Sequence, residues 1–150
     1  MEAVQEAHKI LDSMLGKLGF ELEIEEQESE EGTCLQITCE DSKFLIGRHG
    51  ERLDDIQYLV NRILQKHDPD APRVKVDADH YREQEEERIE EQARDLAEQA
   101  KESGKVMRMR PLNAYHRRIV HNALVDDEEV ETSSPRGSDR LKRIEIRPRS

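Results

Sequence analysis

The residues whose types and spacing best suit chemistry form a short glycine loop, Gly47-Arg48-His49-Gly50. Two glycines let a backbone turn sharply and let another chain come close, and Arg48 adds a positive charge at the same place. The loop precedes a predicted long helix, whose first amides can donate to a phosphate. The neighbouring Leu45 and Ile46 offer an apolar floor for unpaired bases. The pattern predicts a clamp for a single strand, although Gly-x-x-Gly by itself also fits an ordinary turn between helices.

A second candidate pair, Arg117 and His121, lies four residues apart in another predicted helix. This spacing places both side chains on one face, which we expect to be exposed because apolar residues at 119, 120, 123 and 124 define another face. An arginine offers a planar fork to phosphate, and a histidine one turn along can donate to phosphate or stack on a base. The pair could hold one nucleotide, whereas the two residues alone also fit a solvated helix face.

The distribution of charge limits where a polyanion could bind. The 150-residue chain has a net charge of −11, which by itself argues against nucleic acid. Residues 1–104 carry 13 basic and 28 acidic residues, whereas residues 105–150 carry 11 basic and 7 acidic residues. We therefore expect a basic surface at the C-terminal end. The alternative is that the charge only solvates a small protein adapted to salt.

Several other functions find no support in the sequence. No run of about 18 apolar residues and no secretory signal is present, so we expect no membrane insertion and a cytoplasmic location. Cys34 and Cys39 are expected on opposite faces of one strand, as reduced packing residues. His116 and His121 are five residues apart, whereas metal ligands one helical turn apart are separated by three or four. We expect no metal, no cofactor and no enzymatic activity.

Hydrophobic periodicity predicts an α+β fold of two small modules joined through a long charged helix. In the first module, a helix over residues 3–18 has an apolar stripe that includes Leu18. The elements expected after it are two antiparallel strands around a polar turn at 26–32, a helical turn at 41–46, the glycine loop, a helix at 51–66 and a strand at 74–76. The last strand returns over a helix and is therefore expected to pair in parallel.

The second module is expected to begin with the charged helix, over residues 80–103, which has only a thin apolar stripe. That stripe consists of Ile89, Ala93, Leu96, Ala97 and Ala100. The elements expected after it are a strand at 106–109, a helix at 113–124, and strands near 129–133 and 141–147.

The segment Leu45–Asn61 resembles the KH domain of the bacterial Jag family, both in its residues and in its place among the predicted elements. The resemblance implies a type II-like KH domain over residues 1–79, with helices on one face of a three-stranded sheet. It also implies that nucleic acid is bound at Gly47, Arg48, His49 and Gly50, with Ile46 beside them. Domains of this kind engage about four nucleotides.

The segment Met109–His121 closely resembles the Jag version of the R-three-H domain, whose signature pair Arg117 and His121 match. The resemblance implies such a domain over residues 80–150, with its leading helix at 80–104. Val130–Pro148 resembles the family's final hairpin. His116 stands where the family commonly has glutamate, which removes a possible capping box with Asn113. The basic surface would be extended by Arg110, Arg118, Arg140, Lys142 and Arg143.

The resemblance implies a single-stranded RNA-binding protein, either a post-transcriptional regulator or an RNA chaperone. It links the chain to bacterial cell growth, division and envelope homeostasis. Single-stranded DNA is a further candidate ligand, and a small KH protein or a second copy of the chain is a candidate partner. The alternative function is an acidic scaffold for other proteins, in which nucleic acid binds weakly or only at the C-terminal module.

Overall fold

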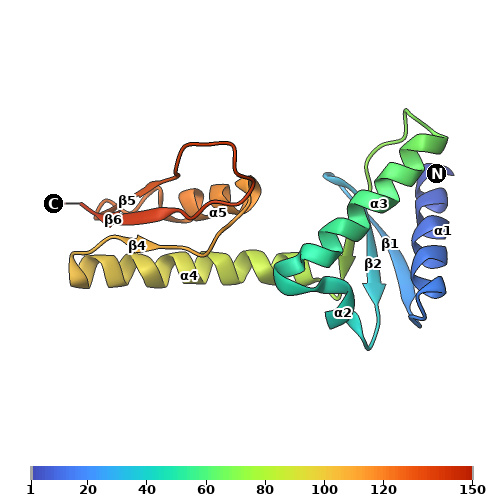
Figure 1. The fold of residues 1–150 in the computed structure, drawn as a ribbon, viewed down its shortest axis with the longest axis horizontal. Helices are drawn as coiled ribbons and strands as arrows, with labels where there is room; N and C mark the ends of the chain where they lie inside the picture. Colours follow the sequence, from blue (N-terminus) through green and yellow to red (C-terminus); the bar gives the residue numbers. More distant parts are fainter. Residues whose placement is uncertain (1, 150) are drawn as a thin grey trace. The chain divides into compact units, whose positions relative to one another are not determined.

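The computed structural model describes residues 2–149 and forms two compact units that divide between Arg82 and Glu83 (Figure 1). Each unit has a three-stranded sheet and its own hydrophobic core, so the predicted α+β class is confirmed. Within the described residues, no helix combines the length and the apolar character needed to cross a membrane.

The first unit contains the elements predicted for the N-terminal module. They are α1 (Glu2–Lys17), β1 (Glu23–Ser29), β2 (Gly32–Thr38), α2 (Ser42–Ile46), the 3-10 turn η1 (Arg48–Gly50), α3 (Glu51–His67) and β3 (Lys75–Ala78). The strands lie in the order β1-β2-β3, with β1 antiparallel and β3 parallel to β2. Both predicted strand directions are therefore confirmed.

The core of this unit lies between the sheet and the helices α1, α2 and α3. Leu35 and Ile37 alternate along β2, and Val76 and Ala78 along β3, so that one face of each strand is apolar and fully buried. Leu45 of α2 joins the same core with only 2% of its surface exposed. The short helix before the glycine loop is therefore anchored to the sheet.

Two boundary predictions in this unit were wrong. β1 continues to Ser29, so the hairpin turn occupies only residues 30–31 instead of 26–32. The glutamates of β1 lie on an edge strand, where side chains are as solvated as in a turn, and composition does not separate the two. In α1, Leu15 is fully buried whereas Leu18 is 69% exposed, because the helix ends at Lys17.

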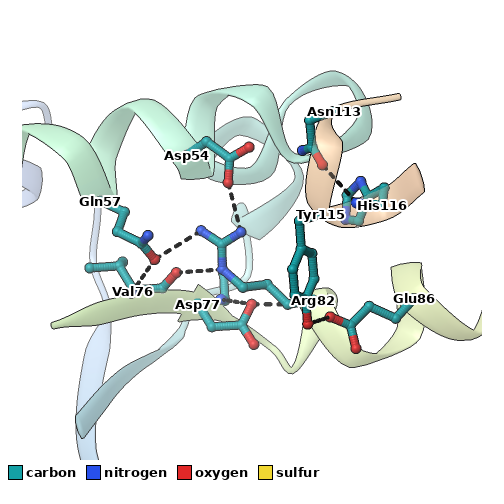
Figure 2. Close-up of polar contacts among 10 residues, drawn as sticks. Asp54, Gln57, Val76, Asp77, Arg82, Glu86, Asn113, Tyr115 and His116 are labelled. Atoms are coloured by element: carbon teal, nitrogen blue, oxygen red, sulfur yellow. Dashed lines mark hydrogen bonds and ion pairs between the residues drawn. The ribbon is translucent and has the colours of Figure 1, made fainter. Parts of the chain in front are cut away.

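Side chains of α3 and of the following helix cover the outer edge of β3. Asn61 donates to the carbonyl oxygen of Val74 at 2.7 Å and accepts from its amide at 2.8 Å. Gln57 Oε1 accepts from the Val76 amide at 2.9 Å, and Arg82 Nε donates to the Val76 oxygen at 3.0 Å (Figure 2). The edge strand is thus paired by side chains, which satisfies its backbone groups.

The second unit is formed by most of a long helix and by the elements that follow it. α4 (Tyr81–Ser103) starts in the first unit and continues into the second. The elements after it are β4 (Met107–Arg108), α5 (Ala114–Leu124), β5 (Val130–Ser133) and β6 (Glu145–Pro148). β6 is antiparallel to both its neighbours in the order β4-β6-β5, and the β5–β6 pair confirms the predicted final hairpin.

The thin apolar stripe predicted for α4 is confirmed. Ile89, Ala93, Ala97 and Ala100 are buried against residues of α5 and the sheet, and small residues let the other elements pack close to the helix. The last strand is shorter than predicted and begins at Glu145, because the chain before it pairs less regularly, through a bridge of Lys142 with Leu112 and one bond from the Met109 amide to the Ile144 oxygen.

Candidate nucleic-acid interface

The glycine loop adopts a backbone that ordinary residues rarely take. Gly47, His49 and Gly50 all have positive φ, of 71°, 54° and 83°. The Gly47 amide closes α2 by donating to the Lys43 oxygen at 3.1 Å, and α3 begins at Glu51 directly after the loop. The chain therefore reverses within four residues and ends at the positive end of a 17-residue helix.

The loop also leaves no room for side chains at its two glycines. A Cβ on Gly47 would lie 2.9 Å from Cγ of Arg52, and a Cβ on Gly50 would lie 3.0 Å from Cε2 of Tyr81. Arg52 reaches back across the loop, where its guanidinium donates to the Phe44 oxygen at 2.8 Å. Neither Arg52 nor Tyr81 was predicted from the sequence, because their contacts follow from the loop's three-dimensional path.

The polar side chains of the loop lie on the surface. Arg48 and His49 are exposed, and Ile46 is half-buried with part of its side chain against the core. Leu45, the other half of the predicted apolar floor, belongs to the core, so only Ile46 remains available beside the loop. Within residues 2–149, the Arg48 guanidinium makes no hydrogen bond or ion pair, so this group can bind a phosphate.

Acidic residues accompany the same helix end. Glu51 is exposed, and Asp54 lies in the first turn of α3. Asp54 is paired, however, since Arg82 donates to its Oδ1 at 2.7 Å (Figure 2). The negative charge that would oppose a phosphate near the loop is therefore partly balanced from within the unit.

Arg117 and His121 lie one turn apart on α5, as predicted, but both are half-buried and both side chains are engaged. Arg117 donates to the Leu112 oxygen at 2.6 Å, and His121 Nδ1 lies 2.5 Å from Oγ1 of Thr132 on β5. Burial, with the nearby Arg117 charge, lowers the pKa of His121. The expectation of a fully exposed face was wrong, because the final hairpin packs beside the helix.

The Leu112 oxygen connects α5 to the basic segment before β6. It accepts from the Arg117 guanidinium and also from the Lys142 amide at 3.0 Å. Lys142 Nζ donates to the Gly137 oxygen at 2.6 Å, and Arg143 Nε donates to the Met109 oxygen at 2.8 Å. Two residues of the predicted basic surface are thereby held near α5 by backbone oxygens.

The other predicted basic residues differ in availability. Arg118 and Arg140 are exposed, and in the part of the chain that the structure describes neither guanidinium is held by a hydrogen bond or an ion pair. Arg110 instead pairs with Glu85, whose side chain is only 6% exposed and which also accepts from Arg88. The charge of Arg110 is thus neutralised inside the unit, and we leave this residue out of the interface.

The first turn of α5 contains polar groups that were predicted only in part. The Asn113 side chain nevertheless caps the helix by accepting from the His116 amide at 2.8 Å, without the glutamate of a capping box. Tyr115, which was not predicted from the sequence, is 55% exposed and donates to Glu86 of α4 at 2.5 Å (Figure 2). Across residues 2–149, no group of three or more His, Cys, Asp or Glu side chains is arranged to hold a metal ion.

Comparison with known proteins yields one domain family and several relatives. Residues 87–148 match the R-three-H domain. The chain is 33% identical over 133 residues to the RNA-binding protein KhpB of Clostridium symbiosum, an alignment that covers 89% of the chain and 59% of that relative. It is 27% identical over 124 residues to the RNA-binding protein KhpB of Bacillus subtilis, which covers 83% of the chain and 60% of the relative. The chain thus spans about three fifths of the length of these two relatives.

Proposed function

The chain belongs, over most of its length, to the family of the bacterial KhpB proteins, the Jag family, and from this premise we propose that it binds single-stranded RNA. The proposed binding uses two modules, a KH domain over residues 1–79 and an R-three-H domain over residues 80–150. The names of the relatives support the ligand class, and the geometry of the glycine loop supports the mode of binding.

The loop Gly47–Gly50 is the observation that carries the proposal. It lies between two helices in the order helix, strand, strand, helix, loop, helix, strand, which fits a type II-like KH domain. Its two glycines allow the positive-φ turn that leads the backbone into the first turn of α3, while Arg48 supplies an exposed cation beside it. A single strand that crosses the loop would place unpaired bases against Ile46.

The second module is proposed to contribute contacts from α5 and from the segment before β6. The half-buried Arg117 and His121 are held by Leu112 and Thr132, so their exposed edges are fixed in place before RNA arrives. Arg118, Arg140, Lys142 and Arg143 would add phosphate contacts around them. Weak binding at each module would be reinforced by avidity when one strand meets both.

Replacement of the two central loop residues tests this function. Arg48→Asp with His49→Asp keeps both glycines but places two carboxylates where a phosphate would lie. Lys66→Asp with His67→Asp is the matched control, because it changes an exposed basic-histidine pair at the other end of α3. Fluorescence anisotropy with labelled single-stranded RNA and DNA, at several salt concentrations, measures the affinity, and circular dichroism checks the fold.

We expect the loop variant to lose most RNA affinity and the control variant to keep it. Affinity of the unchanged protein should fall as salt rises, by roughly 0.7 log units per log unit of salt for each phosphate contact on a single strand. Equal binding by both variants would remove the loop from the mechanism. No binding by the unchanged protein would favour the alternative, a protein scaffold, which the net charge of −15 over residues 1–104 motivates.

We further propose that the bound RNAs are transcripts under post-transcriptional control, in processes of cell growth, division and envelope homeostasis. A small KH protein and a second copy of this chain are the proposed protein partners. Crosslinking in cells followed by sequencing would identify the transcripts, and recovery of only background RNA would argue against regulation.

A further inference from the structure

We infer that Arg82 is a positioning residue for the loop: it neutralises Asp54 at the start of α3 and so allows an RNA phosphate to approach. This inference rests on the proposed function and extends it to a residue outside the loop. Arg82 lies four residues after the end of β3, at the start of α4. It belongs neither to the glycine loop nor to the pair Arg117 and His121.

The guanidinium of Arg82 is held in one orientation by three groups of the first unit. Nε donates to the Val76 oxygen at 3.0 Å, one terminal nitrogen donates to Gln57 at 3.2 Å, and the other donates to Asp54 at 2.7 Å (Figure 2). The Arg82 amide also donates to Asp77, whose side chain is almost fully buried. The cation is therefore placed by the sheet edge and is directed at one carboxylate.

The neighbouring Tyr81 packs on the loop itself. Its Cε2 lies 3.0 Å from the position of a Cβ on Gly50, and the ring packs against the core of the unit. Tyr81 packs on Gly50 at the end of the loop, and Arg82 forms an ion pair with Asp54 in the first turn of α3. These two contacts hold the start of α4 beside the loop. The position of Arg82 relative to α3 is consequently set by several contacts instead of by the ion pair alone.

The charge of Asp54 matters because of where it lies. An anion in the first turn of a helix interacts with the same positive helix end that would attract a phosphate. Two unit charges about 7 Å apart in water-like surroundings repel enough to change an affinity by about threefold. A guanidinium bound to the carboxylate cancels most of this repulsion, whereas loss of the guanidinium would restore it.

A double-mutant cycle tests the inference against a purely structural role for Arg82. If Arg82 masks charge, Arg82→Gln should weaken RNA binding by about threefold, and Asp54→Asn should strengthen it by a similar factor because Arg82 becomes a free cation. The double variant should return close to the original affinity. If Arg82 serves only to hold the edge of β3, Asp54→Asn would not restore binding, and that result overturns the inference.

Arg82→Lys separates charge from hydrogen bonding. Lysine can keep a positive charge near Asp54 but cannot reproduce the contacts to Val76 and Gln57 together. We expect it to retain most RNA affinity even where urea unfolding shows a loss of stability. Affinity that falls as far as in Arg82→Gln would contradict charge masking.

Salt dependence and a distant variant complete the test. The difference between Arg82→Gln and the unchanged protein should shrink between 0.1 M and 1 M salt, since the screening length falls from about 10 Å to about 3 Å. Arg62→Gln, which removes an exposed charge farther along α3, should have a smaller effect than Arg82→Gln. If the protein binds RNA and the loop variant weakens this binding, but the cycle shows no coupling between Arg82 and Asp54, the inference is wrong and the proposed function is retained.

Discussion

The imidazole of His121 lies against the hydroxyl of Thr132, with Nδ1 2.5 Å from Oγ1. The contact joins α5 to β5. Burial is the larger cause of the lowered pKa of His121, and the charge of Arg117 adds to it. The neutral imidazole is therefore the form that the folded protein favours.

This pKa shift predicts that stability depends on pH in a defined direction. Below the ordinary value of 6.5, the unfolded chain binds a proton at this position more readily than the folded protein does. Stability should therefore fall as the pH drops from about 7 to 5 and should recover as the pH rises. His121→Asn should flatten this dependence in urea unfolding. Identical slopes for the two proteins would contradict the assignment.

Much of the fold could be predicted from periodicity, because the helices and strands bury one face each. The buried stripe of α4 and the helix after the loop follow from spacing, and the parallel direction of β3 follows from the helix that precedes it. The extent of β1 could not be predicted, since an edge strand with solvated glutamates has the composition of a turn. The exact end of α1, which decides between Leu15 and Leu18, likewise depends on packing.

The candidate site, like the fold, could be predicted from the sequence only in part. Local motifs identified the loop and the pair Arg117 and His121, because each lies within one short segment. The ion pair of Arg110 with Glu85 joins residues 25 positions apart, and that of Arg82 with Asp54 joins residues 28 apart. Which arginines remain free for a ligand is therefore a property of the tertiary fold, and residue type alone does not reveal it.

The contrast between Arg118 and Arg110 leads to a prediction for RNA binding. Arg118→Gln should reduce the salt dependence by roughly 0.7 log units per log unit of salt, the value of one phosphate contact on a single strand. Arg110→Gln should leave that slope unchanged but lower stability, since Glu85 would lose one of its two arginines inside the unit. Anisotropy titrations at four salt concentrations measure both slopes. A reduced slope in Arg110→Gln would return this residue to the interface.

Because Tyr81 packs closely on Gly50, we expect a substitution of Gly50 to lower the free energy of unfolding by more than the backbone strain alone. Gly19 and Gly50 have similar φ values, 92° and 83°, but a Cβ on Gly19 meets no atom within 4 Å. Gly19→Ala should therefore cost about 1 kcal/mol, the strain of a left-handed residue, and Gly50→Ala should cost more because the ring must move.

The two contributions can be separated in a second background. In a protein with Tyr81→Ala, Gly50→Ala should cost about as much as Gly19→Ala, as read from urea unfolding of each pair. Equal costs of the two glycine substitutions in the unchanged protein would show that the ring exerts no steric effect.

The buried side chain of Asn61 leads to a prediction for the stability of the first unit. It is 3% exposed and satisfies both backbone groups of Val74, as an extra strand would. Asn61→Ala would leave a buried amide and a buried oxygen without partners, at a cost of about 2–4 kcal/mol. Urea unfolding and hydrogen exchange of the Val74 amide should both report this loss. Arg62→Ala, an exposed change on the same helix, is the control and should leave the Val74 amide protected; if it accelerates exchange as much as Asn61→Ala does, the edge is not held by Asn61.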